Sequence, residues 1–261
     1  MTTIHYLDPN PAGHPAVLLL HGLGADATSW TLQLPALNGA GFRPIAADTP
    51  GFGQSAYDGG GWSIRRMAAD MASLLGELQT GPAHVVGLSM GGTIAQQFAL
   101  DYPHLTRRLV LVSTFSVLRP DSLSGWLYFM QRFFLVNVLG LPAQAKVVAQ
   151  RIFPGPGNGQ LREMLIETIS RADARAYRKA MASLGLFNSV KRLGEIKIPT
   201  LIVTGADDTT VTPARQRLLV EGIPAARQVI IPDAGHAVPV DQAERFNREL
   251  LEFLATQNQD S

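Results

Sequence analysis

Six short apolar segments recur along this chain, each bounded by glycine, proline or polar residues. They contain at most five residues each and are rich in valine, isoleucine and leucine. Short uninterrupted runs of this kind are typical of strands that are covered on both faces, as in a parallel sheet. We therefore predict strands at residues 16–20, 44–47, 84–86, 109–112, 200–203 and 228–231.

Amphipathic helical patterns lie between several of these segments. The apolar residues of 67–79 fall at the spacing of one helix face, and residues 93–101 and 241–255 follow similar patterns. Strands that alternate with helices indicate an α/β domain. We predict a mostly parallel, open sheet flanked by helices.

The alternation is interrupted between residues 115 and 194, where the pattern is helical throughout. One apolar stripe in this region comprises Trp126, Phe129, Met130, Phe133, Phe134 and Val138. We expect this stripe to be mainly helix-packing core, with some members lining an apolar cavity. A loop rich in proline and glycine, 154–159, separates it from a second stripe. We predict an α/β domain of residues 1–114 and 195–261 that carries an all-helical insertion at 115–194.

Residues 87–91 read Gly-Leu-Ser-Met-Gly, a G-x-S-x-G pattern between a predicted strand and a predicted helix. A strand that turns sharply into a helix crowds its backbone, so the flanking positions favour glycine while the serine Oγ projects outward. The following helix N-terminus supplies N–H groups and positive potential near that oxygen. In this context the pattern indicates that Ser89 is a nucleophile.

A serine hydroxyl is a weak nucleophile, and it needs a base that is itself held by a carboxylate. Asp207 and Asp208 follow the predicted strand 200–203, and His236 follows the strand 228–231. Catalytic groups gather at the carboxyl ends of parallel strands, so we expect these side chains to reach the same edge of the sheet as Ser89. Adjacent carboxylates on one loop cannot both face the imidazole, and the residues alone leave the choice between them open.

These motifs resemble the α/β-hydrolase superfamily, and the resemblance covers almost the whole chain outside residues 115–194. It rests on five segments that occur in the family order: His21–Gly24, Asp48–Ser55, Gly87–Gly92, Gly205–Asp208 and Gly235-His236. The resemblance implies that Ser89 is the nucleophile, Asp208 the acid and His236 the base. It also implies that the helical insertion is a cap over the site.

The resemblance further implies an oxyanion hole made of two backbone N–H groups, those of Leu23 and Met90. His21 is similar to the structural histidine that the family places beside this loop. We interpret Asp48 as a residue that braces its own glycine-rich turn.

The resemblance implies a hydrolase of a carboxylic ester, thioester or lactone that works through an acyl-enzyme. We expect a small-molecule substrate with an apolar part. Two other reactions remain alternatives: carbon–carbon bond hydrolysis and cofactor-free perhydrolysis. A third alternative is a ligand receptor that keeps the three residues but turns its ligand over slowly. Dehalogenases and epoxide hydrolases of this fold are excluded, because they place an aspartate where Ser89 stands.

Composition restricts cofactors and partners. The chain has no cysteine, which excludes disulfides, thiolate metal sites and a cysteine nucleophile. No histidine pair has metal-ligand spacing, and the segment 22–24 lacks the third glycine of a dinucleotide loop, so we expect no metal and no cofactor. The 22 basic and 21 acidic residues are too balanced for a general nucleic-acid binder.

Charge is unevenly distributed along the chain. Residues 115–195 contain eleven Lys or Arg and five Asp or Glu. This surplus could attract an acidic substrate, an acidic acyl carrier or an anionic membrane surface, but we favour the simpler interpretation that these charges lie on solvated helix faces. The chain shows no signal-peptide pattern, and its longest apolar-rich stretch, 126–139, is too short to span a bilayer. We therefore expect a cytoplasmic protein without a transmembrane segment.

Overall fold

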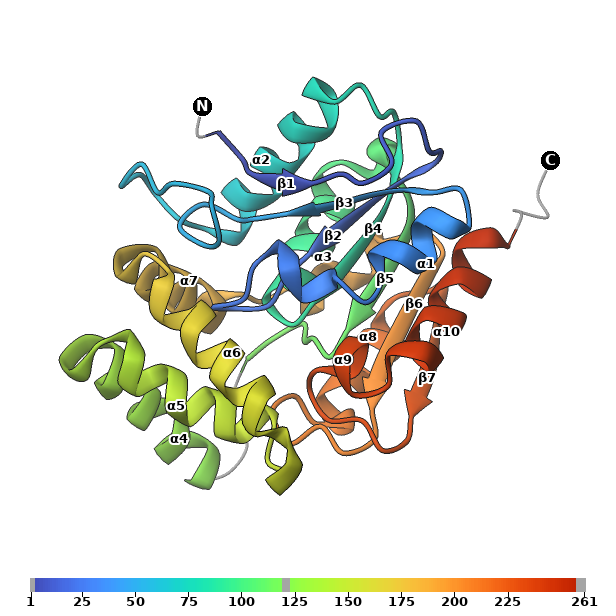
Figure 1. Cartoon of the computed structure of the whole chain (residues 1–261). Helices are drawn as coiled ribbons and strands as arrows, with labels where there is room; N and C mark the ends of the chain where they lie inside the picture. Colours follow the sequence, from blue (N-terminus) through green and yellow to red (C-terminus); the bar gives the residue numbers. More distant parts are fainter. Residues whose placement is uncertain (1–2, 119–122, 257–261) are drawn as a thin grey trace.

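The computed structural model describes residues 3–118 and 123–256. Its centre is a twisted sheet with helices on both faces (Figure 1). The strands lie in the order β1-β3-β2-β4-β5-β6-β7, and every neighbouring pair is parallel except β1 and β3. Their bounds are Tyr6–Leu7 (β1), Ala16–Leu20 (β2), Arg43–Ala47 (β3), Ala83–Leu88 (β4), Thr106–Val112 (β5), Thr200–Gly205 (β6) and Ala226–Ile231 (β7).

The six predicted strands are confirmed, and together they make the parallel part of the sheet. The sequence prediction missed β1, because two residues are too few to show a strand pattern. Residues of the inner strands alternate between two buried clusters: Leu18 and Leu20 face one cluster, whereas Val17 and Leu19 face the other. Both faces of the inner strands are therefore covered, as the uninterrupted apolar runs indicate. The edge strand β7 is only partly buried.

The helices of the α/β domain cover these two faces. Helices α2 (Ile64–Glu77), α3 (Met90–Asp101) and α8 (Pro213–Gly222) contribute to one cluster. Helices α1 (Leu34–Gly39), α9 (Val238–Asp241) and α10 (Ala243–Ala255) contribute to the other. The single helix predicted at 241–255 is wrong at its start, since Gln242 takes a non-helical φ of −135° and divides α9 from α10.

Residues between β5 and β6 form a group of helices at one end of the sheet (Figure 1). These are α4 (Leu123–Phe134), α5 (Leu141–Ile152), α6 (Gly159–Arg171) and α7 (Ala174–Leu186), with a π-helical segment at Leu135–Leu139. The two ends of this region lie together, because Val117 bridges Asn188 and the Ser189 N–H donates to the Ser116 carbonyl at 2.9 Å. Helix α7 is also tied to the α/β domain, where the Ser183 hydroxyl donates to the Trp62 carbonyl.

The apolar stripe of α4 does not pack as expected. Trp126, Met130, Phe133, Phe134 and Val138 are each 52–62% exposed, so the expectation of a helix-packing core is wrong for them; the side chain of Phe129 lies outside those described. Helix α4 instead turns a narrower face inward, with Tyr128 and Arg132 at a cavity, and Val136 of the following π-helical segment is buried. Among the described residues, no helix combines the length and apolarity that crossing a bilayer requires.

Candidate active site

The turn between β4 and α3 presents Ser89. Ser89 has φ 53° and ψ −110°, a conformation that costs roughly 1–3 kcal/mol for a residue with a side chain. The surrounding backbone holds it there: the Ser89 N–H donates to the Val112 carbonyl at 2.9 Å, and the Thr114 hydroxyl donates to the Ser89 carbonyl at 2.7 Å. Helix α3 begins at Met90, so its first N–H groups lie beside the serine.

The glycines around Ser89 are there because the backbone is crowded. A Cβ at Gly87 would lie 2.2 Å from the Gly91 carbonyl oxygen, and a Cβ at Gly91 would lie 2.1 Å from the Leu20 carbonyl oxygen. A Cβ at Gly92 would meet Thr114 at 2.5 Å. The steric reason inferred from the sequence pattern is therefore present in the structure.

Asp208 and His236 form a buried pair at the carboxyl ends of β6 and β7. Their Oδ2 and Nδ1 atoms lie 2.9 Å apart. The other oxygen, Oδ1, accepts from the N–H groups of Thr210 and Val211 at 2.8 and 2.9 Å, which fixes the carboxylate. A carboxylate only accepts, so Nδ1 of His236 carries the proton and Nε2 keeps its lone pair. The imidazole is thus arranged to take up a proton at Nε2.

The two adjacent aspartates differ in their surroundings. The Asp208 carboxylate is buried against His236, whereas the Asp207 residue is exposed. Asp207 lines a second, polar cavity of about 400 Å³, whose wall also includes His236.

Ser89 and His236 line the same cavity, which measures about 140 Å³. Leu23 is also in its wall, while the side chain of Met90 is fully buried and only its backbone adjoins Ser89. A cavity of this size holds a group about as large as benzene. Its wall is mainly apolar and includes Leu88, Val148, Ile152, Phe153, Leu165, Ala237, Pro239 and Val240. The structure therefore brings four of the predicted side chains, Ser89, Asp208, His236 and Leu23, to one place.

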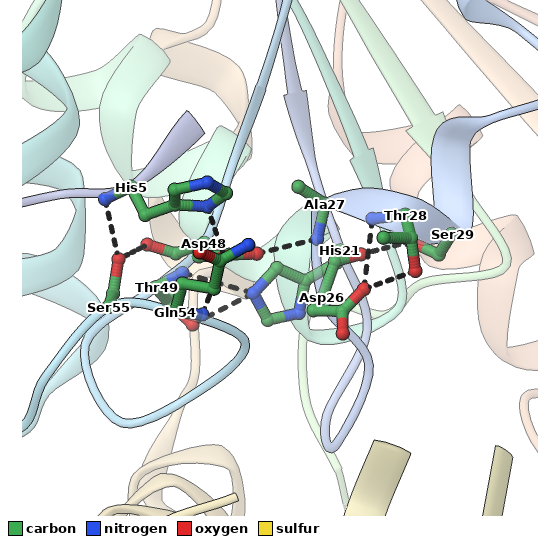
Figure 2. A network of polar contacts seen from close by, with 10 residues as sticks. All are labelled: His5, His21, Asp26, Ala27, Thr28, Ser29, Asp48, Thr49, Gln54 and Ser55. Atoms are coloured by element: carbon green, nitrogen blue, oxygen red, sulfur yellow. Dashed lines mark hydrogen bonds and ion pairs between the residues drawn. The ribbon is translucent and has the colours of Figure 1, made fainter. Parts of the chain in front are cut away.

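Asp48 braces the loops beside the cavity, as inferred from the sequence. Its Oδ1 accepts from the Ala27 N–H at 2.6 Å, and its Oδ2 accepts from the Gln54 N–H at 2.9 Å (Figure 2). The His5 ring nitrogen Nδ1 lies 2.7 Å from Oδ2. One buried carboxylate thus ties the segments after β2 and β3 together.

His21 connects the same two loops (Figure 2). Its Nε2 accepts from the Thr49 N–H at 3.0 Å, and its Nδ1–H donates to the Gly22 carbonyl at 2.8 Å. Burial lowers the pKa of His21, which keeps the ring neutral and suited to this donor and acceptor pattern. The peptide groups that precede Leu23 are therefore held in place.

Sequence reasoning missed two residues near the site. Arg132 lines the cavity of Ser89, and the only sequence signal for it is a charge within an apolar helical pattern. Asp241 accepts from the Gly235 N–H at 2.9 Å and so supports the loop that carries His236. Burial raises the pKa of Asp241. Within residues 3–118 and 123–256, no cluster of three or more His, Asp or Glu side chains is placed to hold a metal ion.

Comparison with known proteins places this geometry in a family. A model described as alpha/beta hydrolase family matches residues 17–249. A protein from Variovorax paradoxus named "Putative carbamate hydrolase RutD" is 36% identical over 97% of this chain and 96% of its own length. The 2-hydroxy-6-oxononadienedioate/2-hydroxy-6-oxononatrienedioate hydrolase of Burkholderia vietnamiensis is 31% identical over 96% of this chain and 90% of its own length.

Solved structures agree with the sequence comparisons. The enol-lactonase from Burkholderia xenovorans LB400 superposes with a TM-score of 0.89 at 26% identity, covering 98% of this chain and 97% of the enol-lactonase. The family match spans far more than half of the chain and includes Ser89, Asp208 and His236. The chain therefore belongs to the alpha/beta hydrolase family, and it is a hydrolytic enzyme.

Proposed function

We propose that this protein is a serine hydrolase that cleaves a small carboxylic ester, thioester or lactone through an acyl-enzyme. The observation that carries the proposal is the position of His236, which pairs with the buried Asp208 carboxylate and lines the same cavity as Ser89. A nucleophile, a base and a carboxylate that orients the base are the groups that acyl transfer requires.

In the first half of the reaction, Nε2 of His236 accepts the Ser89 proton as Oγ attacks the carbonyl carbon. Asp208 holds the ring and stabilises the imidazolium that forms. The N–H groups of Leu23 and Met90 stabilise the oxyanion of the tetrahedral intermediate, and one such donor is typically worth about 10²–10³ in rate. The bond to the leaving oxygen or sulfur then breaks, and the leaving group takes the proton from Nε2.

In the second half, water attacks the acyl carbon of the ester on Ser89. Nε2 of His236 accepts a proton from this water and returns it to Oγ as the acid is released. The substrate and this water are the only reactants that the two halves require in addition to the side chains and N–H groups named here.

Residues 115–194 act as a cap that shapes the substrate site. Support comes from the cavity wall, to which this region contributes Tyr128, Arg132, Val148, Ile152, Phe153 and Leu165. A space about as large as benzene with such a wall favours short acyl groups with an apolar part.

A second candidate is hydrolysis of a carbon–carbon bond beside a ketone. The relative from Burkholderia vietnamiensis, named for hydrolysis of an oxononadienedioate, favours it. A carbamate, the substrate class in the name of the Variovorax relative, also presents a carbonyl carbon with an oxygen leaving group. Both reactions would use the same Ser89, His236 and Asp208.

A fluorophosphonate probe followed by peptide mapping tests the nucleophile. We expect a single labelled peptide that contains Ser89, and Ser89→Ala should lose both labelling and turnover while keeping its thermal unfolding temperature. Labelling elsewhere, or turnover by Ser89→Ala, would contradict the proposal. Assays on p-nitrophenyl esters of graded chain length, a lactone, a carbamate and a vinylogous diketone then separate the substrate classes.

A further inference from the structure

The cavity of Ser89 has a cation in its otherwise apolar wall. Arg132 lies on the inward face of α4 and lines this cavity together with Ser89 and His236. Its Nη2 donates to the Tyr177 hydroxyl at 3.2 Å. The Gln144 amide is oriented with its oxygen toward Arg132, so that this oxygen accepts from Nε at 2.7 Å and from Nη2 at 2.9 Å. All of these partners are neutral.

The charge of Arg132 has no acidic counterpart in the part of the chain that the structure describes. Its aromatic neighbours are uncharged: the Tyr177 hydroxyl accepts from Nη2, and the centre of the Tyr128 ring lies 5.8 Å from the guanidinium carbon. A guanidinium stays protonated in proteins, so a full positive charge adjoins the catalytic cavity. A second guanidinium, that of Arg151, lies 4.3 Å from the centre of the Tyr128 ring and adds to the positive potential of this wall.

The geometry also leaves donors of Arg132 available. A guanidinium has five N–H groups, and the hydrogen bonds above use only those on Nε and Nη2. Among the described residues, none accepts from Nη1, so its two N–H groups can serve a bound molecule. Taking a cation out of water is costly unless it is paired, and an anionic partner would offset that cost.

We propose that Arg132 binds a carboxylate of the substrate, so that this enzyme acts on short esters or lactones that carry a second, free carboxylate. This inference rests on the proposed function for the identity of the cleaved bond. A planar carboxylate matches the guanidinium fork. The cavity size limits the group between the cleaved carbonyl and the carboxylate to a few carbons.

A binding experiment tests this without requiring turnover. The Ser89→Ala variant is titrated calorimetrically with the p-nitrophenyl monoester of glutaric acid and with p-nitrophenyl 5-methylhexanoate, in which an isopropyl group replaces the carboxylate. We expect the carboxylate ester to bind about 10- to 100-fold more tightly, the range for hydrogen bonds to charged groups. Adding Arg132→Gln to Ser89→Ala should abolish this difference.

A matched control changes an arginine of the same region that faces solvent. Arg171 has a side chain that is 75% exposed and pairs with Glu167, so Arg171→Gln should leave the preference as it is in the parent variant. Arg132→Lys keeps the charge but loses the planar fork, and it should retain part of the preference. This variant keeps the proposal testable if Arg132→Gln does not fold.

A second pair of esters places the carboxylate in the alcohol portion: 4-acetoxybenzoate is compared with its methyl ester. Equal affinities within both pairs would overturn the proposal, and so would an undiminished preference in a folded Arg132→Gln variant. If the fluorophosphonate probe labels Ser89 but neither ester pair shows a preference for the carboxylate, only this inference is contradicted. If the carboxylate esters bind more tightly but the probe does not label Ser89, the proposed function is contradicted instead.

Discussion

Oδ2 of Asp208 lies 2.9 Å from Nδ1 of His236, while the adjacent Asp207 faces solvent. An amide in place of the Asp208 carboxylate can donate to Nδ1, which would favour the wrong tautomer of the imidazole. We expect Asp208→Asn to lower kcat by about 10³–10⁴, as the same change does in serine proteases. Steady-state hydrolysis of a p-nitrophenyl ester measures it.

Asp207→Asn is the matched control for this prediction, because it makes the same chemical change one residue away. It should keep kcat within about twofold of the original enzyme, as expected of an exposed side chain without a partner in the reaction. Equal losses in both variants would contradict the assignment of Asp208.

The backbone around Ser89 predicts a steric effect of substitution at Gly91. A Cβ there would lie 2.1 Å from the Leu20 carbonyl oxygen, so β2 and α3 would have to separate. Gly91→Ala should therefore lower the free energy of unfolding by about 3 kcal/mol or more, as severe overpacking of a protein core does. The midpoint of urea unfolding measures this loss.

Gly76→Ala provides the contrast, since Gly76 is an exposed residue of helix α2 and a Cβ there meets nothing within 4 Å. Alanine should stabilise this helix by about 0.5–1 kcal/mol. A Gly91→Ala variant as stable as Gly76→Ala would refute the crowded-backbone explanation of the motif.

The buried carboxylate of Asp48 accepts hydrogen bonds from two loops (Figure 2). In Asp48→Asn, one oxygen can still serve the Ala27 N–H, but the amide NH₂ would oppose the Gln54 N–H and the His5 ring. We expect a loss of about 1–3 kcal/mol, the usual cost of leaving a hydrogen-bonding group without its partner. Chemical denaturation measures the change.

His5→Ala removes only one partner of Asp48, and the His5 side chain is 30% exposed. Its cost should stay below about 1 kcal/mol. If Asp48→Asn cost no more than His5→Ala, the carboxylate would not be bracing the two loops.

His84 predicts a pH dependence of stability. Burial, together with the nearby charges of Arg107 and Arg108, lowers the pKa of His84 to about 4 from an ordinary value of 6.5. Below about pH 6.5 the unfolded chain therefore takes up a proton that the folded chain does not, so this residue reduces stability as the pH falls. Between about pH 8 and about pH 5 we expect a contribution of about 2 kcal/mol.

In His84→Leu this part of the pH dependence should disappear. Urea unfolding at the two pH values gives the difference, with His104→Leu as the control because His104 is exposed. The same decline in stability for His84→Leu and the original protein would exclude His84 as its cause. His84 lies near the start of β4, at the opposite end of that strand from Ser89, so the test leaves the catalytic loop intact.

Local sequence determines the sheet and the turn that carries Ser89. The apolar runs predict the parallel strands because burial on both faces demands an uninterrupted apolar segment. Gly87 and Gly91 indicate the strand-to-helix turn because no side chain fits between the backbones there. The apolar strands and the glycine-flanked turn each depend on residues that are close together in the sequence. Both can therefore be predicted from the order of the residues.

Tertiary structure decided the features that depend on distant segments. Only the convergence of the loops after β6 and β7 places Asp208 rather than Asp207 against His236, since the two aspartates are chemically identical. The orientation of α4 similarly exposes Trp126 and turns Arg132 toward the cavity, although the apolar stripe of that helix indicated the reverse. Helical periodicity defines the faces of a helix, but the packing of other segments against it determines which face becomes buried.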